Sequence, residues 1–278
     1  MIGPDQAWRS LNRANWDERV AVHLGAEDYE LGALRAGRGG LNPIEEAELG
    51  PVDGLRVLHP QCHFGRDSLI LAQRGAEVTG LDFSPPAIAA ARELAAELDL
   101  AGRTRFVEAD LYDAQAAIPE PGSFDLVFVT WGAINWLPDI RRWAEIVAWF
   151  VKPGGALYLA EAHPAALVLD DAAPRHGDMP GWFVPYFHRE PLVLDDPRDY
   201  ADATARLRNA RSYEWIHPLG EIVTALLTAG LTLRWLHEHE AVTWRMFEVL
   251  VEDASGMYRW PERPWLPLAF SLRAERLF

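Results

Sequence analysis

The sequence contains a single cysteine, Cys62, in 278 residues, which excludes a disulfide bond within the chain. Proteins that do without disulfides are typical of a reducing compartment. The first twenty residues, MIGPDQAWRSLNRANWDERV, are polar and charged and contain no apolar signal segment. No apolar run reaches the length that spans a bilayer. We therefore expect a cytoplasmic protein with no membrane partner.

Positive charge is also scarce, with 26 lysines and arginines against 41 aspartates and glutamates. The resulting net charge of −15 repels phosphate backbones, and the arginines are scattered and form no basic strip. We therefore expect no nucleic-acid partner and predict a small-molecule substrate. The oligomeric state stays open between a monomer and a homodimer.

What is present between residues 55 and 163 is an alternation of short apolar strands and amphipathic helices. Strands are expected at 55–59, 77–83, 105–111, 123–132 and 156–163. The helix after the second strand should begin at Pro85, with Ser84 as its N-cap. Four strand–helix crossovers in a row indicate a parallel, doubly wound α/β sheet.

Further segments extend this α/β core on both sides. Residues 6–38 follow a helical pattern. Residues 164–214 are rich in proline, acids and aromatics, which predicts an inserted lid with short antiparallel strands. A helix is expected at 218–230, and strands are expected after it at 231–239, 244–253 and 266–274. Two late strands without a full helix between them predict a hairpin at the sheet edge.

The turn after the first strand, HPQCHFG at residues 59–65, has one glycine where ligand-binding turns of such sheets usually have two or three. Gly65 stands at the start of a helix whose free N–H groups can meet a carboxylate. Gln61 and His63 occupy positions where bare backbone is usual. We therefore expect a binding site with more side-chain atoms in it than usual.

The order of VLHPQCHFG, GLDFS, EADLYD, FDLVFV, KPGGALYLAE and a terminal hairpin resembles the class I S-adenosylmethionine-dependent methyltransferases. The resemblance covers residues 55–163 and, by topology, 217–278, and it extends to a bacterial subgroup of uncharacterised small-molecule methyltransferases. It implies a Rossmann-like sheet of seven strands, mostly parallel, with an antiparallel last strand. It also implies one domain, 1–278, with four parts. These are an N-terminal helical lid (1–50), a cofactor-binding core (51–163), an inserted substrate lid (164–214) and the end of the core with the terminal hairpin (215–278).

The resemblance implies that S-adenosylmethionine is the cofactor and S-adenosylhomocysteine the product. Asp82, just after the second strand, would accept two ribose hydroxyls, and Phe83 would pack on the adenine. Asp110 would accept from the adenine amino group, with the N–H of Leu111 beside it. The other residues that the resemblance places around the cofactor are His59, Gln61, Cys62, His63, Gly65, Ser84, Thr130, Trp131, Gly132 and, on the N-terminal helix, Trp16.

The acceptor would lie beside TWGAINWL, which follows the fourth strand. The predicted acceptor contacts are Asn135, Trp136, His163, Trp182, Tyr186 and Trp215. Aromatic side chains, if clustered, can cage an apolar or cationic group. His163, at the end of the fifth strand, is the candidate general base by position, and His217 is a second candidate.

Each of these residues also has a purely structural interpretation. HPQCHFG can be a plain strand–helix turn, Asp82 a helix cap and Asp110 an exposed loop acid. The aromatic residues can be core of the lid, and histidines are more often hydrogen-bonded in the fold than catalytic.

Two other functions remain open on sequence grounds. A nicotinamide-dependent oxidoreductase needs Gly-x-Gly-x-x-Gly after the first strand, which HPQCHFG does not provide. A non-catalytic relative that binds the cofactor and acts through a partner is consistent with the glycine-poor turn. His237 and His239 share one face of a late strand, but exposure at the sheet edge is favoured over a metal site, and we predict no metal.

Overall fold

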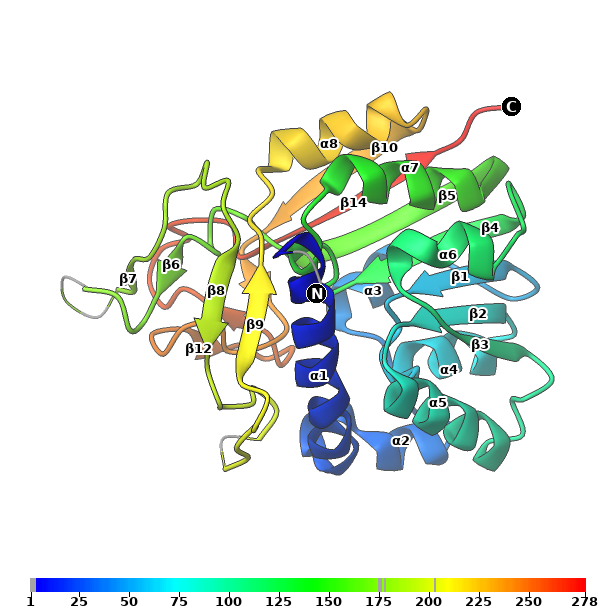
Figure 1. The fold of residues 1–278 in the computed structure, drawn as a ribbon, viewed down its shortest axis with the longest axis horizontal. Helices are drawn as coiled ribbons and strands as arrows, with labels where there is room; N and C mark the ends of the chain where they lie inside the picture. Colours follow the sequence, from blue (N-terminus) through cyan, green and yellow to red (C-terminus); the bar gives the residue numbers. More distant parts are fainter. Residues whose placement is uncertain (1–3, 175–176, 178, 203) are drawn as a thin grey trace.

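The computed structural model describes residues 4–174, 177, 179–202 and 204–278. Its centre is a seven-stranded sheet in the order β10-β14-β5-β4-β1-β2-β3 (Figure 1). The strands are β1 Arg56–Pro60, β2 Glu77–Asp82, β3 Thr104–Glu108, β4 Phe124–Thr130, β5 Val151–Ala162, β10 Thr232–His239 and β14 Ala269–Glu275. Strand β14 is antiparallel to both of its neighbours, and β1 to β5 pair in parallel. The predicted mostly parallel sheet with an antiparallel last strand is confirmed.

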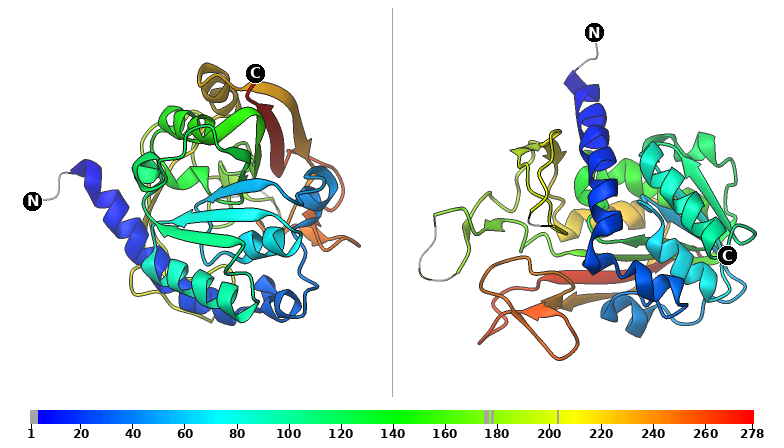
Figure 2. Two further views of the ribbon diagram at one scale, coloured as in Figure 1. Left: turned by 90° about the vertical axis from the view of Figure 1, so that its right-hand side faces the viewer. Right: turned by 90° about the horizontal axis from the view of Figure 1, so that it is seen from below.

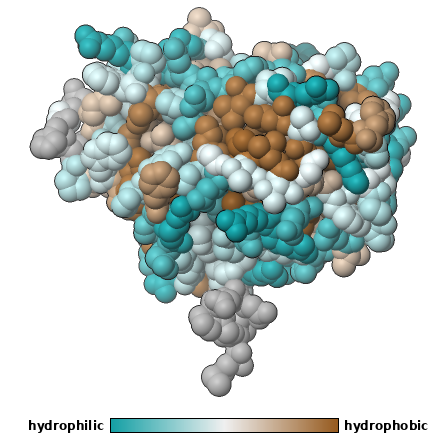
Figure 3. Space-filling view, turned by 90° about the horizontal axis from the view of Figure 1, so that it is seen from above, coloured by the Kyte–Doolittle hydropathy of each residue, from teal (hydrophilic) through white to brown (hydrophobic). Residues whose placement is uncertain are grey.

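Helices cover both faces of this sheet (Figures 1 and 2). The helices on one face are α2 Leu31–Arg35, α4 Arg66–Gln73 and α5 Pro85–Glu97, and those on the other are α6 Ala114–Ala117, α7 Ile140–Phe150 and α8 Leu219–Thr228. Successive strand residues point to opposite faces of the sheet. Val57 packs in the core under α2, α4 and α5, and Leu58 packs in the core under α6, α7 and α8. Hydrophobic residues also reach the surface over α7 and α8 (Figure 3), where Leu227 is 50% exposed.

Local sequence sets where the helices of the core begin and end. The Ser84 side chain accepts a hydrogen bond from the N–H of Ala87, and Pro85 is the first residue of α5, as predicted. Gly75, just after α4, has a φ of 95°, a left-handed conformation that costs glycine little. These two devices turn the chain back toward the sheet on either side of β2.

The carboxyl ends of the parallel strands are covered by the N-terminal helix and by the insertion. Helix α1, Pro4–Gly25, crosses in front of the strand ends, between the sheet and the insertion (Figures 1 and 2). The insertion holds two short antiparallel pairs, β6 Leu169–Asp170 with β7 Gly181–Trp182 and β8 Leu192–Asp195 with β9 Arg211–Glu214. Asn12 of α1 both donates to the carbonyl of Tyr213 and accepts from its N–H, at 2.8 and 2.7 Å. Helix α1 thus occupies part of the open edge of β9.

Three boundaries differ from the sequence prediction. The helix expected over 6–38 is interrupted after Gly25, a poor helix former, and continues as the short helix η1 Glu27–Tyr29 and α2. The strand expected at 156–163 already begins at Val151, and KPGG forms a bulge within it, because Phe124 pairs with Val151 and Leu126 with Ala156. Of 244–253 only β12, Val251–Glu252, is a strand, in a small sheet with β13 Tyr258–Arg259 and β11 Ala241–Val242.

Candidate active site at the carboxyl ends of the strands

Residues 61–65, the glycine-poor loop, leave β1 with a strained backbone. Gln61 has a φ of 57°, His63 of 52° and Gly65 of 77°. Left-handed conformations at residues with a side chain are uncommon and tend to occur at functional sites. At Gly65 a Cβ atom would lie 2.7 Å from the ring of Phe106, so glycine is required there. The other two positions carry side chains in the conformation that glycine usually adopts.

Gln61 connects this loop to the one that follows β4. Its Nε2 donates to the carbonyl of Ala133 at 2.8 Å, and because a carbonyl can only accept, this contact fixes which way the amide points. Its Oε1 is buried and has no hydrogen-bond partner among the described residues. Cys62 is buried against Gly80, and burial raises the pKa of its thiol.

Asp82, at the end of β2, is a buried acceptor, with 6% of its surface exposed. Its Oδ2 accepts from the N–H of His63 at 2.8 Å and its Oδ1 from the N–H of Ser84 at 2.9 Å. Burial raises the pKa of Asp82 to about 6, against the effect of these two bonds. Each oxygen keeps a lone pair for a further donor. Phe83 beside it is half-buried.

The other strand ends place His59, Thr130 and Asp110 differently. His59 is buried, bonds to Ser68 Oγ through Nδ1 at 2.8 Å, and has its pKa lowered by burial to about 4. Thr130 is buried at the end of β4. Asp110 is half-buried and caps the short helix η2, Leu111–Asp113, by accepting from the N–H of Tyr112. His59 and Thr130 are thus buried, whereas the Asp110 carboxylate is partly exposed.

Residues 131–136, the partition loop, follow β4 and include the short helix η3, Ile134–Trp136. Three N–H groups of this loop donate to the buried Glu161 carboxylate: those of Gly132, Ala133 and Ile134, at 2.7, 2.6 and 3.0 Å. Trp131, with a φ of 40°, donates from Nε1 to the buried Glu45 of helix α3, Pro43–Glu48, at 2.6 Å. Together with Gln61, two carboxyl groups therefore hold this loop in one conformation.

A cleft of about 550 Å³ lies on the far side of the partition loop, between the insertion and the β10–β14 connection. Its lining includes Asn135, Phe183, Leu194, Glu214, Trp215 and Phe247. Asn135 donates from Nδ2 to Glu214 at 3.1 Å, and its Oδ1 is buried without a partner in the described part of the chain. The charged residues of the lining are Asp170, Asp171, Glu214, Glu248 and Arg198, so its charge is mainly negative.

Aromatic contacts join helix α1 to both loops. The ring of Trp16 makes edge contacts with His63 at 5.2 Å and with Trp136 at 5.3 Å. Asp17, the next residue, accepts from Ser84 Oγ at 2.6 Å. The sequence-predicted residues Trp16, His63, Ser84 and Trp136 are thus brought together, and α1 packs over the strand ends.

Two further predicted acceptor residues, Trp182 and Tyr186, and the two candidate bases do not line this cleft. Trp182 is 74% exposed and does not line the cleft, and the Tyr186 hydroxyl accepts from the N–H of Leu219 at 3.0 Å, at the start of α8. His217 is buried with Nε2 2.8 Å from the carbonyl of Leu137. His163 accepts from the N–H of Ala165 at Nδ1, and its Nε2 lies 3.0 Å from Glu238.

This arrangement counts against His163 as the general base. The lone pair that would take a proton is already used by the Ala165 N–H, and the other nitrogen faces a carboxylate. His237 and His239 also have protein partners, Glu48 and Ser271. The contacts of Glu45, Glu161 and Glu214 with the partition loop could not be foreseen from the sequence, because each joins residues that are far apart along the chain.

The sequence of residues 57–155 matches a family model described as a methyltransferase domain. The chain is 32% identical over 120 residues to a ubiquinone biosynthesis O-methyltransferase of Leptothrix cholodnii, covering 43% of this chain and 49% of that one. It is 37% identical over 112 residues to a demethylmenaquinone methyltransferase of Thermus thermophilus, covering 39% and 48%. The chain thus spans about half the length of these relatives.

Solved structures share the fold over most of the chain. An S-adenosylmethionine dependent methyltransferase from Mesorhizobium loti superposes with a TM-score of 0.53 at 21% identity, covering 84% of this chain and 96% of that one. The glycopeptide N-methyltransferase MtfA, complexed with S-adenosylmethionine, gives 0.53 at 20% identity, covering 88% and 94%.

The sheet order, the covering helices and the loops at the strand ends define the class I methyltransferase fold. By this fold the chain is similar to the class I S-adenosylmethionine-dependent methyltransferases, and residues 57–155 carry the sequence of a methyltransferase domain. None of the helices in the described ranges combines the length and apolar character that crossing a membrane requires.

Proposed function

We propose that this protein transfers the methyl group of S-adenosylmethionine to a small-molecule acceptor by in-line displacement. The observation that carries this proposal is the position of Asp82. It is a buried acceptor at the end of β2, bonded to the N–H of His63 in the glycine-poor loop, within the segment that matches the methyltransferase domain. The sulfonium cofactor supplies the reactive methyl group, and the protein supplies binding and alignment.

The side chains around the glycine-poor loop fit this cofactor in kind. Asp82 offers one free lone pair on each oxygen for the two ribose hydroxyls. The buried Oε1 of Gln61 is an acceptor without a partner in the described ranges, and an ammonium group would satisfy it. Asp110, whose partly exposed carboxylate lies 3.7 Å from Arg9 Nε, would accept from the adenine amino group. Gln61 thus places a side-chain acceptor at a position of the loop where bare backbone is usual.

The acceptor molecule would occupy the cleft beyond the partition loop. The apolar part of the lining suits an apolar or aromatic molecule, and the negative charge of the lining disfavours an anion. The unpartnered Oδ1 of Asn135 calls for a donor on the acceptor, which a hydroxyl or an amine would provide. These features also support the proposal that nucleic acids are not substrates.

Alignment is the contribution that the protein's own residues can make. In the partition loop, Ala133 is bonded to the glycine-poor loop, and Asn135, two residues on, lines the cleft. The loop would therefore lie between the cofactor on one side and the acceptor molecule on the other. Glu45 and Glu161 hold this loop rigid. Two partners aligned at van der Waals distance gain several kcal/mol without a catalytic side chain, roughly 7 kcal/mol in favourable cases.

We also propose that residues 1–50 and 164–214 act as the cover of the active site in a cytoplasmic enzyme. Helix α1 and β9 are bonded to each other through Asn12 and Tyr213. The single buried Cys62 is suited to a reducing compartment.

Titration calorimetry tests the cofactor. We expect S-adenosylhomocysteine to bind and NADH not to bind; NADH binding alone would favour an oxidoreductase. Methyl transfer from S-adenosylmethionine to a panel of phenols and aromatic amines then tests the reaction. Cofactor binding without any transfer, to any member of the panel or to cell-extract metabolites, would favour the non-catalytic alternative.

The cleft is tested by Phe183→Ala, with Phe187→Ala as the matched control. Both phenylalanines are in the insertion and exposed, at 42% and 66%, but Phe183 lines the cleft and Phe187 does not. Removing an aromatic contact should raise the acceptor KM by about tenfold and leave cofactor affinity unchanged. Equal kinetics in the two variants would place the acceptor elsewhere.

A further inference from the structure

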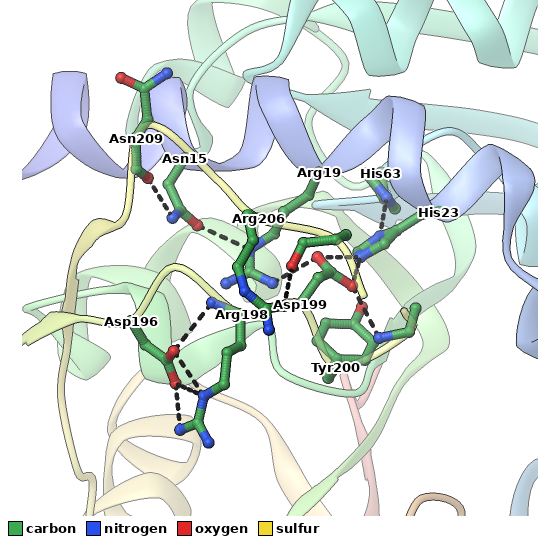
Figure 4. Close-up of polar contacts among 12 residues, drawn as sticks. Asn15, Arg19, His23, His63, Asp196, Arg198, Asp199, Tyr200, Arg206 and Asn209 are labelled. Atoms are coloured by element: carbon green, nitrogen blue, oxygen red, sulfur yellow. Dashed lines mark hydrogen bonds and ion pairs between the residues drawn. The ribbon is translucent and has the colours of Figure 1, made fainter. Parts of the chain in front are cut away.

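A buried polar cluster joins three parts of the chain that are far apart in sequence (Figure 4). His23 of α1 lies between Asp199 of the insertion and His63 of the glycine-poor loop. Its Nε2 is 3.1 Å from both Asp199 oxygens, and its Nδ1 is 2.9 Å from His63 Nε2. The side chains of His23 and Asp199 have no exposed surface. None of these contacts belongs to the methyl-transfer steps described above.

Asp199 determines the direction of hydrogen bonding at one end of this cluster. Its oxygens also accept from Arg19 Nη1 and from the N–H of Ala201, each at 2.8 Å. Burial alone would raise the pKa of Asp199, but the His23 side chain, followed by the N–H of Ala201 and the charge of Arg19, outweighs it and holds the pKa below its usual value. The carboxylate is therefore ionised and can only accept, so the proton of His23 that faces it must be on Nε2.

The proton positions on the two imidazole rings then follow for the uncharged form of His23. A neutral His23 with its proton on Nε2 has a bare Nδ1. His63 Nε2 lies 2.9 Å from that nitrogen and must carry a proton for the contact to be attractive. The Tyr29 hydroxyl, 3.0 Å from the same His23 nitrogen, can also donate a hydrogen bond to it. His63 Nδ1 is consequently the unprotonated nitrogen. The charged and titratable groups that face His23 are Asp199, Arg19, His63, Tyr29 and Tyr200.

The free nitrogen of His63 lies in the proposed cofactor site. His63 is half-buried, its backbone N–H bonds to Asp82, and its Nδ1 has no hydrogen-bond partner among residues that the structure describes. Burial lowers the pKa of the His63 imidazole well below its usual value, so the ring is neutral at physiological pH. His63 is thus a neutral acceptor with a fixed tautomer beside Asp82, the carboxylate proposed to bind the ribose, and such an acceptor suits a cationic donor.

We propose that Asp199 and His23 form a tautomer relay that keeps His63 Nδ1 as an acceptor for the ammonium group of the bound cofactor. This proposal rests on the proposed function. His63 would touch the cofactor together with Gln61, since an ammonium group has three N–H donors. Asp199 and His23 are positioning residues that act through His63. The insertion thus contributes to cofactor affinity without contacting the cofactor, and cofactor binding favours the closed insertion in return.

The first test reads the tautomers directly, by nitrogen-15 NMR of the histidine rings of the full chain at pH 8 without ligand. We expect His63 to be protonated at Nε2 in the wild type. Asp199→Asn should shift His63 toward the Nδ1-protonated form, because a neutral amide no longer requires a donor from His23. Asp196→Asn is the matched control, since Asp196 pairs with Arg198 at the surface of the same segment. A wild-type His63 protonated at Nδ1 overturns the proposal.

The second test compares S-adenosylhomocysteine with an analogue whose amino group is replaced by hydrogen. In the wild type we expect the analogue to bind at least about tenfold more weakly, as expected for the loss of hydrogen bonds to a charged group. Asp199→Asn should weaken S-adenosylhomocysteine by about tenfold and the analogue less than twofold. Asp196→Asn should change neither affinity.

The outcomes separate the relay from the function on which it rests. Failure of S-adenosylhomocysteine to bind the wild type overturns both. Wild-type binding with equal losses for the two ligands in Asp199→Asn overturns the relay alone, because the cluster then only holds the fold together. If that variant does not fold, the wild-type tautomer and the wild-type comparison of the two ligands still decide the question.

Discussion

At the scale of single residues, the site depends on polar atoms that the fold has buried and oriented. Asp82, Gln61 and Asn135 are each oriented by hydrogen bonds to the protein and keep some acceptor capacity. Asp82 keeps a lone pair on each bonded oxygen, whereas Gln61 Oε1 and Asn135 Oδ1 have no partner among the described residues. Buried acceptors without a partner are costly, roughly 1–3 kcal/mol each. Their presence on both sides of the partition loop is the residue-level argument for two ligands.

The raised pKa of Asp82 predicts that cofactor affinity falls at acidic pH. Its pKa is raised to about 6, with burial as the largest cause, so the free protein becomes protonated there below pH 6. Two ribose hydroxyls require the ionised form, and binding must then release the proton. We expect the S-adenosylhomocysteine Kd to be constant from pH 7 to 8 and about tenfold weaker at pH 5. Calorimetry over this range measures it.

Substitutions provide the controls for this pH dependence. Asp82→Ala should weaken cofactor binding at least about tenfold at pH 8, since two hydrogen bonds to a carboxylate are lost. Glu97→Ala, which removes an exposed carboxylate paired with Arg35, should leave the affinity and its pH dependence unchanged. An acid limit that persists in Asp82→Ala would assign it to another group.

At the scale of secondary-structure elements, the short helix α3 supports the partition loop at a cost in stability. Glu45 of α3 is fully buried, and burial, followed by the nearby charge of Asp67, raises its pKa to about 8. Its Oε1 accepts from Trp131, and its Oε2 has no partner in the described part of the chain. The folded state therefore favours the protonated acid.

This raised pKa predicts that the protein loses stability as the pH rises. The stabilisation from protonated Glu45 is complete below its unfolded pKa of roughly 4.5 and disappears through a folded pKa of about 8. Between pH 6 and 8 the loss is on the order of 2 kcal/mol, at about 1.4 kcal/mol per pH unit. Glu45→Gln keeps the donor and acceptor pattern without a charge, so it should remove this dependence. Urea unfolding of both proteins at pH 6 and 8 measures this. An equal change in the free energy of unfolding between the two pH values in the wild type and in Glu45→Gln would contradict the assignment of the pH dependence to Glu45.

At the scale of the whole molecule, helix α1 and the insertion are hydrogen-bonded to each other over the strand ends, in keeping with the proposed cover. Asn12 bonds to both backbone groups of Tyr213, and Glu18 accepts from the N–H groups of Arg208 and Asn209. The same helix contacts the glycine-poor loop through Trp16 and His23. Motion of the cover and occupancy of the loop should therefore be coupled.

Hydrogen exchange tests this coupling across the molecule. Addition of S-adenosylhomocysteine should slow amide exchange severalfold in α1 and in β8–β9 together, because both close on the loop. Strands β10 and β14, at the far edge of the sheet, serve as the internal control. In Asn12→Ala the protection of β8–β9 should fall while that of the loop remains. Protection confined to residues 61–65 would show that the cover moves independently.

The amino-acid sequence by itself determined the core and the resemblance to a family. The features used were local ones: the alternation of strands and helices, Ser84 before Pro85, and the acid at Asp82. Such features can be read from hydrophobic periodicity and capping residues without knowledge of the fold. They were sufficient for the parallel sheet, its antiparallel last strand and the methyltransferase resemblance. The KPGG segment was recognised, but its bulge within β5 was not, because a register depends on the partner strand.

Only the tertiary structure decided how the side chains around the site are paired. His163 had the position of a base, yet the Ala165 N–H occupies its lone pair. Asp199 lies in an acidic stretch with no motif, and its buried contact with His23 spans 176 residues of sequence. Hydrogen-bond direction, burial and therefore pKa depend on neighbours that the chain brings together only on folding. That is why the family could be inferred from the sequence and the relay at His63 could not.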